Sequence, residues 1–352
     1  MAPDQQRIGI HRSSTQRRIA DPRRTKIIKH GAKNFSIEDI VPDEGSVLVL
    51  TSGGYIKRTS PDEYRQQKRG GVGVVDLNTK EEDFVTDFLT TTTHSELLFF
   101  TDKGKAFQIK MYDIPEGKRA TRGKSIMNFL SISDGEKVTS ILPMPKKVKE
   151  SKLSLMLTTR DGTAKKVSAA SFHDVRRSGI IAIRLDDGDQ LVSAAFVEKG
   201  DDVIAVSSDG QSIRFKEDDV REMGRGAGGV RVMKLDKGAR VVGVDVIKKE
   251  NANAFLMVMT ANGYGKQTEL GEYKTQGRGG SGIITVKVTA KTGELIASKV
   301  ITPEVSEIVA MSKKSQVIRI DAKEIPTLGR QTQGVRIMKL REGDNIASLV
   351  CL

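Results

Sequence analysis

Basic side chains recur at two fixed places along this chain, and their spacing is typical of a surface that binds a polyanion. One set follows a turn by three or four residues, and the other lies next to a later glycine. The first set is Lys57, Arg58, Lys165, Lys166, Arg214, Lys266 and Arg319; the second is Arg69, Arg122, Lys124, Arg176, Arg177, Arg225, Arg278 and Arg330. Cations form charge-assisted hydrogen bonds with phosphate oxygens. Repetition at a fixed register therefore predicts a track of phosphate contacts, whereas a lone arginine would indicate only a solvated surface.

The most distinctive local string is Gln-Lys-Arg-Gly-Gly-Val-Gly at residues 67–73. Glycine allows positive φ and close backbone approach, so main-chain amides and the two adjacent cations could contact the same phosphate. The candidate binding residues of this loop are Gln67, Lys68, Arg69, Gly70, Gly71 and Gly73. A similar string, Gln-Gly-Arg-Gly-Gly-Ser-Gly, occupies residues 276–282.

Signals for catalysis or cofactor binding are weak by comparison. The four histidines are scattered without ligand or triad spacing, and the acidic run at 186–189 lacks the EF-hand pattern, so it indicates a β-turn. The glycine-rich stretch at 224–229 is not followed by a helix of a βαβ unit, which argues against a dinucleotide site. We expect no metal, no cofactor, no small-molecule substrate and no catalytic residue in this chain.

Short β-rich hairpins must position the basic residues. Six segments resemble one another, and each has an apolar strand, a polar turn and a second, alternating strand. They occupy residues 46–59, 96–109, 153–167, 202–215, 254–268 and 307–320. The turn holds Gly54, Gly104, Gly162, Gly210 and Gly263, with Ser315 in the sixth copy, and a second glycine follows at Gly71, Gly123, Gly179, Gly229, Gly280 and Gly334.

The two glycine positions recur at nearly constant spacing in all six copies, which predicts six units of about fifty residues. Units of this length with about four strands each are typical of propeller blades, which bury their apolar faces by stacking around a ring. The predicted fold class is all-β, a six-bladed disc of four-stranded repeats. A pair of β-sandwiches with three repeats each is the alternative, although no linker-like composition separates the third copy from the fourth.

The charge distribution divides the chain into two parts. The 352 residues carry a formal net charge of +13, of which +7 comes from nine Lys or Arg against two Asp in residues 1–33. We therefore expect a basic arm or linker at residues 1–45 and the repeat domain at residues 46–352. No long apolar stretch or secretory signal is present, and the single Cys351 fits a reducing compartment, so a cytoplasmic location is expected.

Composition and energetics favour duplex DNA as the polyanion. Aromatic residues make up only 5% of the chain, so stacking on unpaired bases is not expected. Bending about 40 base pairs through a half turn costs on the order of 10 kcal/mol. If each phosphate contact contributes about 1 kcal/mol, about ten contacts are needed, which several blades with two basic positions each could supply.

Residues 67–73, preceded by GGYIKRTSPDEYR, resemble the gyrase box of the C-terminal domain of the DNA gyrase A subunit. Six of its seven positions match, and Val72 stands where the family usually has a basic residue. The string IADPRRTKI at 19–27 is similar to the end of the gyrase A breakage-reunion region, and FSIEDIVPDE at 35–44 is similar to the connection that enters the first blade. The resemblance therefore covers the whole chain.

This resemblance implies a six-bladed β-pinwheel, a disc whose blades exchange strands and whose basic rim wraps DNA. It also implies a non-catalytic part of a bacterial, nucleoid-associated, ATP-dependent type IIA topoisomerase that introduces negative supercoils. The partners would be double-stranded DNA, the gyrase A breakage-reunion domain and the gyrase B subunit. ATP and Mg²⁺ would bind outside this chain. No tyrosine follows an arginine, so the nucleophile of the breakage domain is not expected in this chain.

Three other interpretations remain open at this point. The chain could be a propeller scaffold for acidic proteins, a propeller enzyme with a central site, or the C-terminal domain of the topoisomerase IV A subunit. The propeller enzyme would require convergent acids or histidines at one repeated strand position, and the sequence shows none.

The loop at 67–73 gives the first testable prediction. The variant Arg69→Ala should weaken DNA wrapping with little change in the free energy of unfolding, because one phosphate contact is lost while the apolar strands are untouched. Ligation of nicked circular DNA in the presence of each protein measures wrapping through the linking number. Equal shifts with the variant and the wild type would remove this loop from the DNA contacts.

Overall fold

The apolar strands form separate four-stranded antiparallel sheets, as the hairpin pattern predicts. The computed structural model describes residues 36–61, 83–118, 121–251, 253–314 and 316–351. The chain divides into two compact units, residues 1–42 and residues 43–352. In the first unit, the described part contains one 3₁₀ turn, η1 (Ile37–Asp39), which Ser36 caps through a hydrogen bond from the backbone N–H of Asp39 to its hydroxyl.

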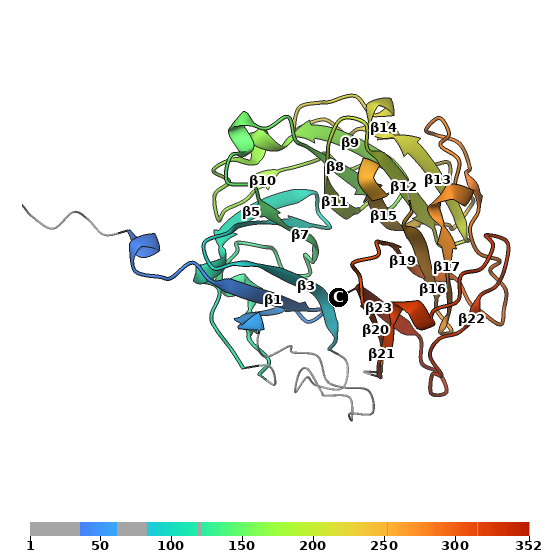
Figure 1. Cartoon of the computed structure of the whole chain (residues 1–352). Helices are drawn as coiled ribbons and strands as arrows, with labels where there is room; N and C mark the ends of the chain where they lie inside the picture. Colours follow the sequence, from blue (N-terminus) through green and yellow to red (C-terminus); the bar gives the residue numbers. More distant parts are fainter. Residues whose placement is uncertain (1–35, 62–82, 119–120, 252, 315, 352) are drawn as a thin grey trace, which may run out of the picture. The chain divides into compact units, whose positions relative to one another are not determined.

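The second unit is a ring of six sheets (Figure 1). From the inner to the outer strand, sheet 1 is β3 (Val85–Thr92), β1 (Gly45–Thr51), β2 (Tyr55–Thr59) and β6 (Lys124–Ser125), and sheet 2 is β7 (Val138–Met144), β4 (Glu96–Thr101), β5 (Lys105–Lys110) and β10 (Ile180–Ile181). Sheet 3 is β11 (Leu191–Val197), β8 (Ser154–Thr159), β9 (Thr163–Ser168) and β14 (Val230–Arg231).

The remaining sheets follow the same plan. Sheet 4 is β15 (Val241–Ile247), β12 (Asp202–Ser207), β13 (Gln211–Lys216) and β18 (Ile283–Ile284), and sheet 5 is β19 (Leu295–Ile301), β16 (Phe255–Thr260), β17 (Tyr264–Glu269) and β22 (Val335–Arg336). Sheet 6 has three strands within the described residues, β23 (Ile346–Cys351), β20 (Glu307–Ser312) and β21 (Val317–Asp321).

Short 3₁₀ turns follow most of the hairpins; these are η3 (Met111–Asp113), η6 (Ala169–Phe172), η7 (Glu217–Asp219), η9 (Leu270–Glu272) and η10 (Ala322–Glu324). Of the others, η4 (Ile126–Asn128) follows the exchanged strand β6, and η5 (Val148–Glu150) and η8 (Lys249–Asn251) follow the inner strands β7 and β15. In the part of the chain that the structure describes, no helix has the length and apolar character needed to cross a membrane.

Each core lies between two neighbouring sheets, which explains the continuously apolar strands. In β4, Leu97 and Phe99 pack against sheet 1, whereas Leu98 and Phe100 pack against sheet 3. A strand covered on both faces has no polar side, so its sequence loses the alternation of a half-exposed strand. Six such cores occur among the described residues, and one of them joins sheet 6 to sheet 1. The six-bladed all-β prediction is confirmed, and the pair of β-sandwiches is wrong because contacts between inner strands run continuously around the ring, including β23 with β3.

The outermost strand of sheets 1 to 5 comes from the following repeat. Thus β14, which belongs to the fourth repeat, pairs with β9 of the third through Val230 opposite Ala164. The glycine before each exchanged strand lies close to the receiving sheet: a Cβ on Gly229 would lie 2.5 Å from the Ala164 carbonyl oxygen. In the fifth repeat this position is Gly282, whose φ is +82°, and not Gly280 as the sequence spacing predicted.

Substitution of Gly229 tests this close approach. Gly229→Ala should lower the free energy of unfolding by at least about 2 kcal/mol, because φ is +107° and the new methyl group meets a backbone carbonyl. Gly226→Ala is the matched control, since no heavy atom lies within 4 Å of its Cβ position. Urea unfolding measures both variants, and equal stabilities would contradict the close approach.

Candidate nucleic-acid interface

Each exchanged strand is preceded by a loop that carries glycines and cations. We call these loops the glycine connections; those with described residues end at Gly123, Gly179, Gly229, Gly282 and Gly334. Because the strand that follows is the outermost of its sheet, each connection lies at the outer edge of the ring (Figure 1). The exchange thus brings the cations of one repeat to the sheet of the repeat before it.

Three lysines expected on this edge lie instead in the interior. Lys57, Lys165 and Lys266 are at most 1% exposed. Their Nζ atoms donate to backbone carbonyls, including Thr121 O at 2.9 Å from Lys57 and Arg330 O at 2.7 Å from Lys266. The rim assignment of these lysines is therefore wrong, because backbone carbonyl groups, most of them from the next repeat, surround each ammonium group.

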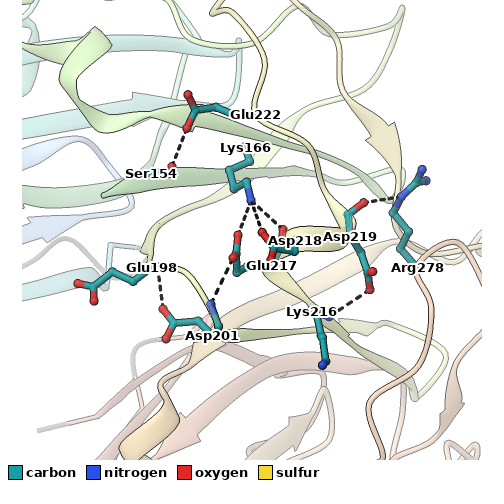
Figure 2. Close-up of polar contacts among 11 residues, drawn as sticks. Ser154, Lys166, Glu198, Asp201, Lys216, Glu217, Asp218, Asp219, Glu222 and Arg278 are labelled. Atoms are coloured by element: carbon teal, nitrogen blue, oxygen red, sulfur yellow. Dashed lines mark hydrogen bonds and ion pairs between the residues drawn. The ribbon is translucent and has the colours of Figure 1, made fainter. Parts of the chain in front are cut away.

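Lys166 is also buried, within an acidic cluster between sheets 3 and 4 (Figure 2). Its Nζ forms an ion pair with Glu217 and lies 3.5 Å from an Asp218 carboxylate oxygen. Hydrogen bonding from Glu217 is the main cause that lowers the pKa of Asp218, and the charge of Lys166 adds to it. Since two acids face this lysine, the structure also corrects its assignment to the rim.

Several predicted rim arginines are already partnered, and all of them except the exposed Arg319 are half-buried. Arg58 contacts Ile114 O and Glu116, and Arg214 contacts Asp202 and the carbonyls of Leu270 and Tyr273. Arg319 pairs with Glu307, and Arg330 contacts Glu272 and Ile284 O. Arg122 lies over the Tyr55 ring. A guanidinium with an acid or carbonyl on one side has fewer donors left for phosphate. Arg319 pairs within its own hairpin, whereas the other four arginines contact a neighbouring repeat.

A smaller group of the predicted residues is exposed. Within the described residues, no ion pair or hydrogen bond involves the side chains of Lys124, Arg176 or Arg225. Arg177 contacts Asp113 at 2.8 Å but remains 61% exposed. Arg278 donates to the carbonyls of Asp219 at 2.8 Å and Arg231 at 3.1 Å, so it joins sheets 4 and 3 at their outer edges (Figure 2).

The glycine-rich loop of the first repeat lies outside the described residues. This applies to Gln67, Lys68, Arg69, Gly70, Gly71 and Gly73. Their assignment remains a prediction from the sequence.

The structure adds four exposed cations that the sequence analysis missed. Arg184, Lys234, Lys287 and Lys339 each lie five residues after the glycine that precedes an exchanged strand. The sequence did not show this common spacing, because Gly280 stood as the reference glycine of the fifth repeat and so displaced Lys287 by two positions. Alignment on Gly282 reveals a cation at one register in four consecutive repeats.

Three of these cations, Arg184, Lys234 and Lys287, are held beside the glycine connections of the following repeats. The backbone N–H of Arg184 donates to Ala227 O, that of Lys234 to Gly280 O, and that of Lys287 to Thr332 O, at 3.2, 2.9 and 3.1 Å. Arg184 therefore lies next to the connection that carries Arg225. The same relation places Lys234 beside the Arg278 connection and Lys287 beside the Arg330 connection. The result is a series of basic stations at three successive junctions, between repeats 3 and 4, 4 and 5, and 5 and 6.

The inner strands carry charged groups of a different kind. Lys299 Nζ lies 2.6 Å from Asp245 Oδ1, and this carboxylate raises the pKa of the lysine. Burial raises the pKa of Cys351 to about 12, so its thiol stays protonated at neutral pH and is a poor nucleophile. Among the described residues, no three His, Cys, Asp or Glu side chains are grouped to hold a metal ion.

Comparisons with known proteins agree with this geometry. The family model described as "DNA gyrase C-terminal domain, beta-propeller" matches residues 45–92, 95–143, 153–198, 201–248, 254–302 and 306–352. The DNA gyrase A subunit of Lawsonia intracellularis is 40% identical over 92% of this chain and 39% of its own length. Its counterpart in Mycobacterium tuberculosis is 38% identical over 94% of this chain and 39% of its own length. The chain thus spans about two fifths of these relatives.

Two solved structures share the fold. One, described as the structure of a DNA gyrase A C-terminal domain, has a TM-score of 0.73 and 29% identity, and the match covers 88% of this chain and all of that chain. A DNA topoisomerase IV C-terminal domain has a TM-score of 0.71 and 24% identity, with coverage of 89% and 94%. The second similarity shows the shared architecture alone.

The buried lysines generate a prediction about pH. Burial, as the main cause, lowers the pKa of Lys165 and Lys266 to about 8, from 10.5 for an ordinary lysine. Between these values the unfolded chain binds more protons than the folded chain, so deprotonation there increases stability. The free energy of unfolding of the wild type, minus that of Lys266→Met, should therefore rise from pH 8 to 10, by at most about 1.4 kcal/mol per unit.

Urea unfolding across this pH range measures the difference. Lys234→Met, which removes an exposed lysine, is the control. A difference between the wild type and Lys266→Met that stays constant or falls from pH 8 to 10 would contradict the lowered pKa.

Proposed function

Because this chain belongs to the family of DNA gyrase C-terminal β-propeller domains, we propose that it binds duplex DNA along its outer edge and wraps it. The observation that carries the proposal is the series of exposed cations beside successive glycine connections. Arg184, Lys234 and Lys287 are bound through their backbones to the following connection. Neighbouring sheets thus present cations in the same way, which suits a ligand with regularly repeated charge.

Contact with the DNA backbone fits these residues better than readout of bases. The stations consist of flexible cationic side chains and glycine backbone, without a helix or long ribbon that could enter the major groove. Phosphate contacts fix the position of the duplex and carry no sequence information. We therefore expect the affinity for DNA to depend strongly on salt concentration and only weakly on base sequence.

Wrapping requires contacts at several places around the ring and not at a single patch, because bending the duplex costs free energy. A half turn of about 40 base pairs costs on the order of 10 kcal/mol, which one station cannot offset. Stations distributed around the ring can share this cost. In the proposed role the chain supplies the path of the DNA, while ATP, Mg²⁺ and strand cleavage belong to other parts of a bacterial, cytoplasmic gyrase, including its breakage-reunion domain and B subunit.

Removal of the missed cations tests the proposal. The slope of log affinity against log salt concentration is negative, and Lys234→Ala should reduce its magnitude by about 0.9. The fourfold variant, with Arg184, Lys287 and Lys339 also changed to Ala, should reduce the magnitude by up to about 3.6. Lys103→Ala is the charge-matched control, because Lys103 lies in the hairpin turn between β4 and β5.

Two measurements decide the outcome. Titration of a linear duplex at several salt concentrations gives the slopes, and ligation of nicked circular DNA gives the change in linking number. We expect the wild type and Lys103→Ala to shift the linking number and the fourfold variant to shift it less. An unshifted distribution at saturating wild-type protein would remove wrapping from the account, and binding to acidic proteins would then become the leading function.

A further inference from the structure

The buried lysines occupy one register position in alternate sheets. Across their hairpins, Lys57 pairs with Val49, Lys165 with Leu157, and Lys266 with Val258. The equivalent position in sheets 2, 4 and 6 holds Phe107, Ile213 and Ile318. A cation and an apolar residue therefore alternate around the ring at the same place in the fold.

Each lysine reaches the glycine connection of the next repeat. Lys165 Nζ donates to Gly224 O and Ala227 O, both at 3.2 Å, and also to Arg225 O and Ala182 O. Lys57 contacts Lys118 O and Thr121 O, and Lys266 contacts Gly329 O and Arg330 O. An ammonium group has three donors and no acceptor, so a cluster of carbonyl oxygens satisfies it.

The apolar sheets fix their connections in another way. A Cβ on Gly179 would lie 2.5 Å from a ring atom of Phe107, so this glycine packs directly on the aromatic ring. In sheet 4, the side chain of Ile213 lies 3.8 Å from the Cβ position of Gly280. The connections over sheets 2 and 4 need no buried cation, because a glycine without a side chain packs on an apolar residue of the sheet. The connections of repeats 2, 4 and 6 instead direct backbone carbonyls towards the interior.

We propose that Lys57, Lys165 and Lys266 are positioning residues for DNA binding, which hold the connections of repeats 2, 4 and 6 so that their cations face the duplex. This inference rests on the proposed function. The most direct link is at Lys165, which binds the carbonyl of Arg225 while the side chain of Arg225 is exposed. A residue held through its own carbonyl has its Cα fixed, and its side chain then leaves the loop in a defined direction.

Loss of the ammonium group would free the loop. The Arg225 carbonyl would lose its lysine donor, whereas Ala227 O would keep the hydrogen bond from the Arg184 N–H. A buried carbonyl without a donor is unfavourable, so the connection around Arg225 would rearrange until water satisfies it. The glycines at 224, 226 and 228 resist such a change very little, because glycine has the widest conformational freedom. The exposed arginine would remain in the chain but would lose its fixed position.

The variant Lys165→Met tests this role because it keeps the length of the side chain and removes its charge. Amide hydrogen exchange should accelerate at least about tenfold at residues 224–229 and stay unchanged at 329–334, whereas Lys266→Met should show the reverse. Ile213→Met is the matched control, since it changes the same register position in a sheet without a buried lysine. Unchanged exchange at 224–229 in folded Lys165→Met would overturn the proposal.

A double-mutant cycle connects the loop to DNA. Arg225→Ala and Lys165→Met should each weaken binding of a linear duplex about fivefold, and the double variant should weaken it by less than about tenfold, because the arginine contributes little once its loop is free. Additive losses of about 25-fold would show that the two residues act separately and would overturn the positioning role. Failure of the wild type to bind the duplex would instead refute the proposed function.

A measurement on the wild type covers the case in which Lys165→Met does not fold. The Nζ protons of Lys165, followed by NMR with labelled lysine, should exchange with water at least about tenfold more slowly than those of exposed Lys234, and more slowly still when the duplex is bound. Exchange as fast as that of Lys234, or no response to DNA, would overturn the proposal.

Discussion

The exchange of the outermost strand between neighbouring repeats is the constraint on which the rest of this structure depends. A two-residue strand such as β14 contributes little pairing by itself, yet its position forces the preceding glycine against the carbonyl of Ala164. It also brings the glycine connection of one repeat over the sheet of another. The buried lysines, the paired arginines and the exposed stations all take their places from this arrangement.

The six-bladed fold could be predicted from the sequence because its signal is long and repeated. Strands such as β4 are apolar on both faces, and six similar hairpins with turn glycines define the units. The exchanged strands could not be predicted in the same way. Two residues are too few to show periodicity, and the ambiguity between Gly280 and Gly282 was resolved only by the φ of Gly282 and its contact with Ser212 O.

The candidate site was predicted less well, for a reason that concerns environment rather than residue type. A lysine in an alternating strand has the same sequence signature whether its side chain meets water or a cluster of carbonyls. Those carbonyls come from a loop about sixty residues later, as with Lys165 and Arg225. Conversely, Arg184 and Lys234 follow the exchanged strands outside any hairpin, so a search based on hairpin register does not reach them.

Alternation of lysine and apolar residues around the ring shows that one structural problem has two solutions here. Each of sheets 1 to 5, whose connections have described residues, supports the connection that crosses its edge. The support is either an apolar side chain under a glycine, as Phe107 provides for Gly179, or a cation under inward-facing carbonyls, as Lys165 provides. An ammonium group without these acceptors would be costly to bury, and the carbonyls without the ammonium would also be unfavourable, although less so than the charge. The lysine and its loop are therefore interdependent, so a change in either should alter the other. Through this coupling, the buried lysines inside the ring determine the direction of cationic side chains on its surface.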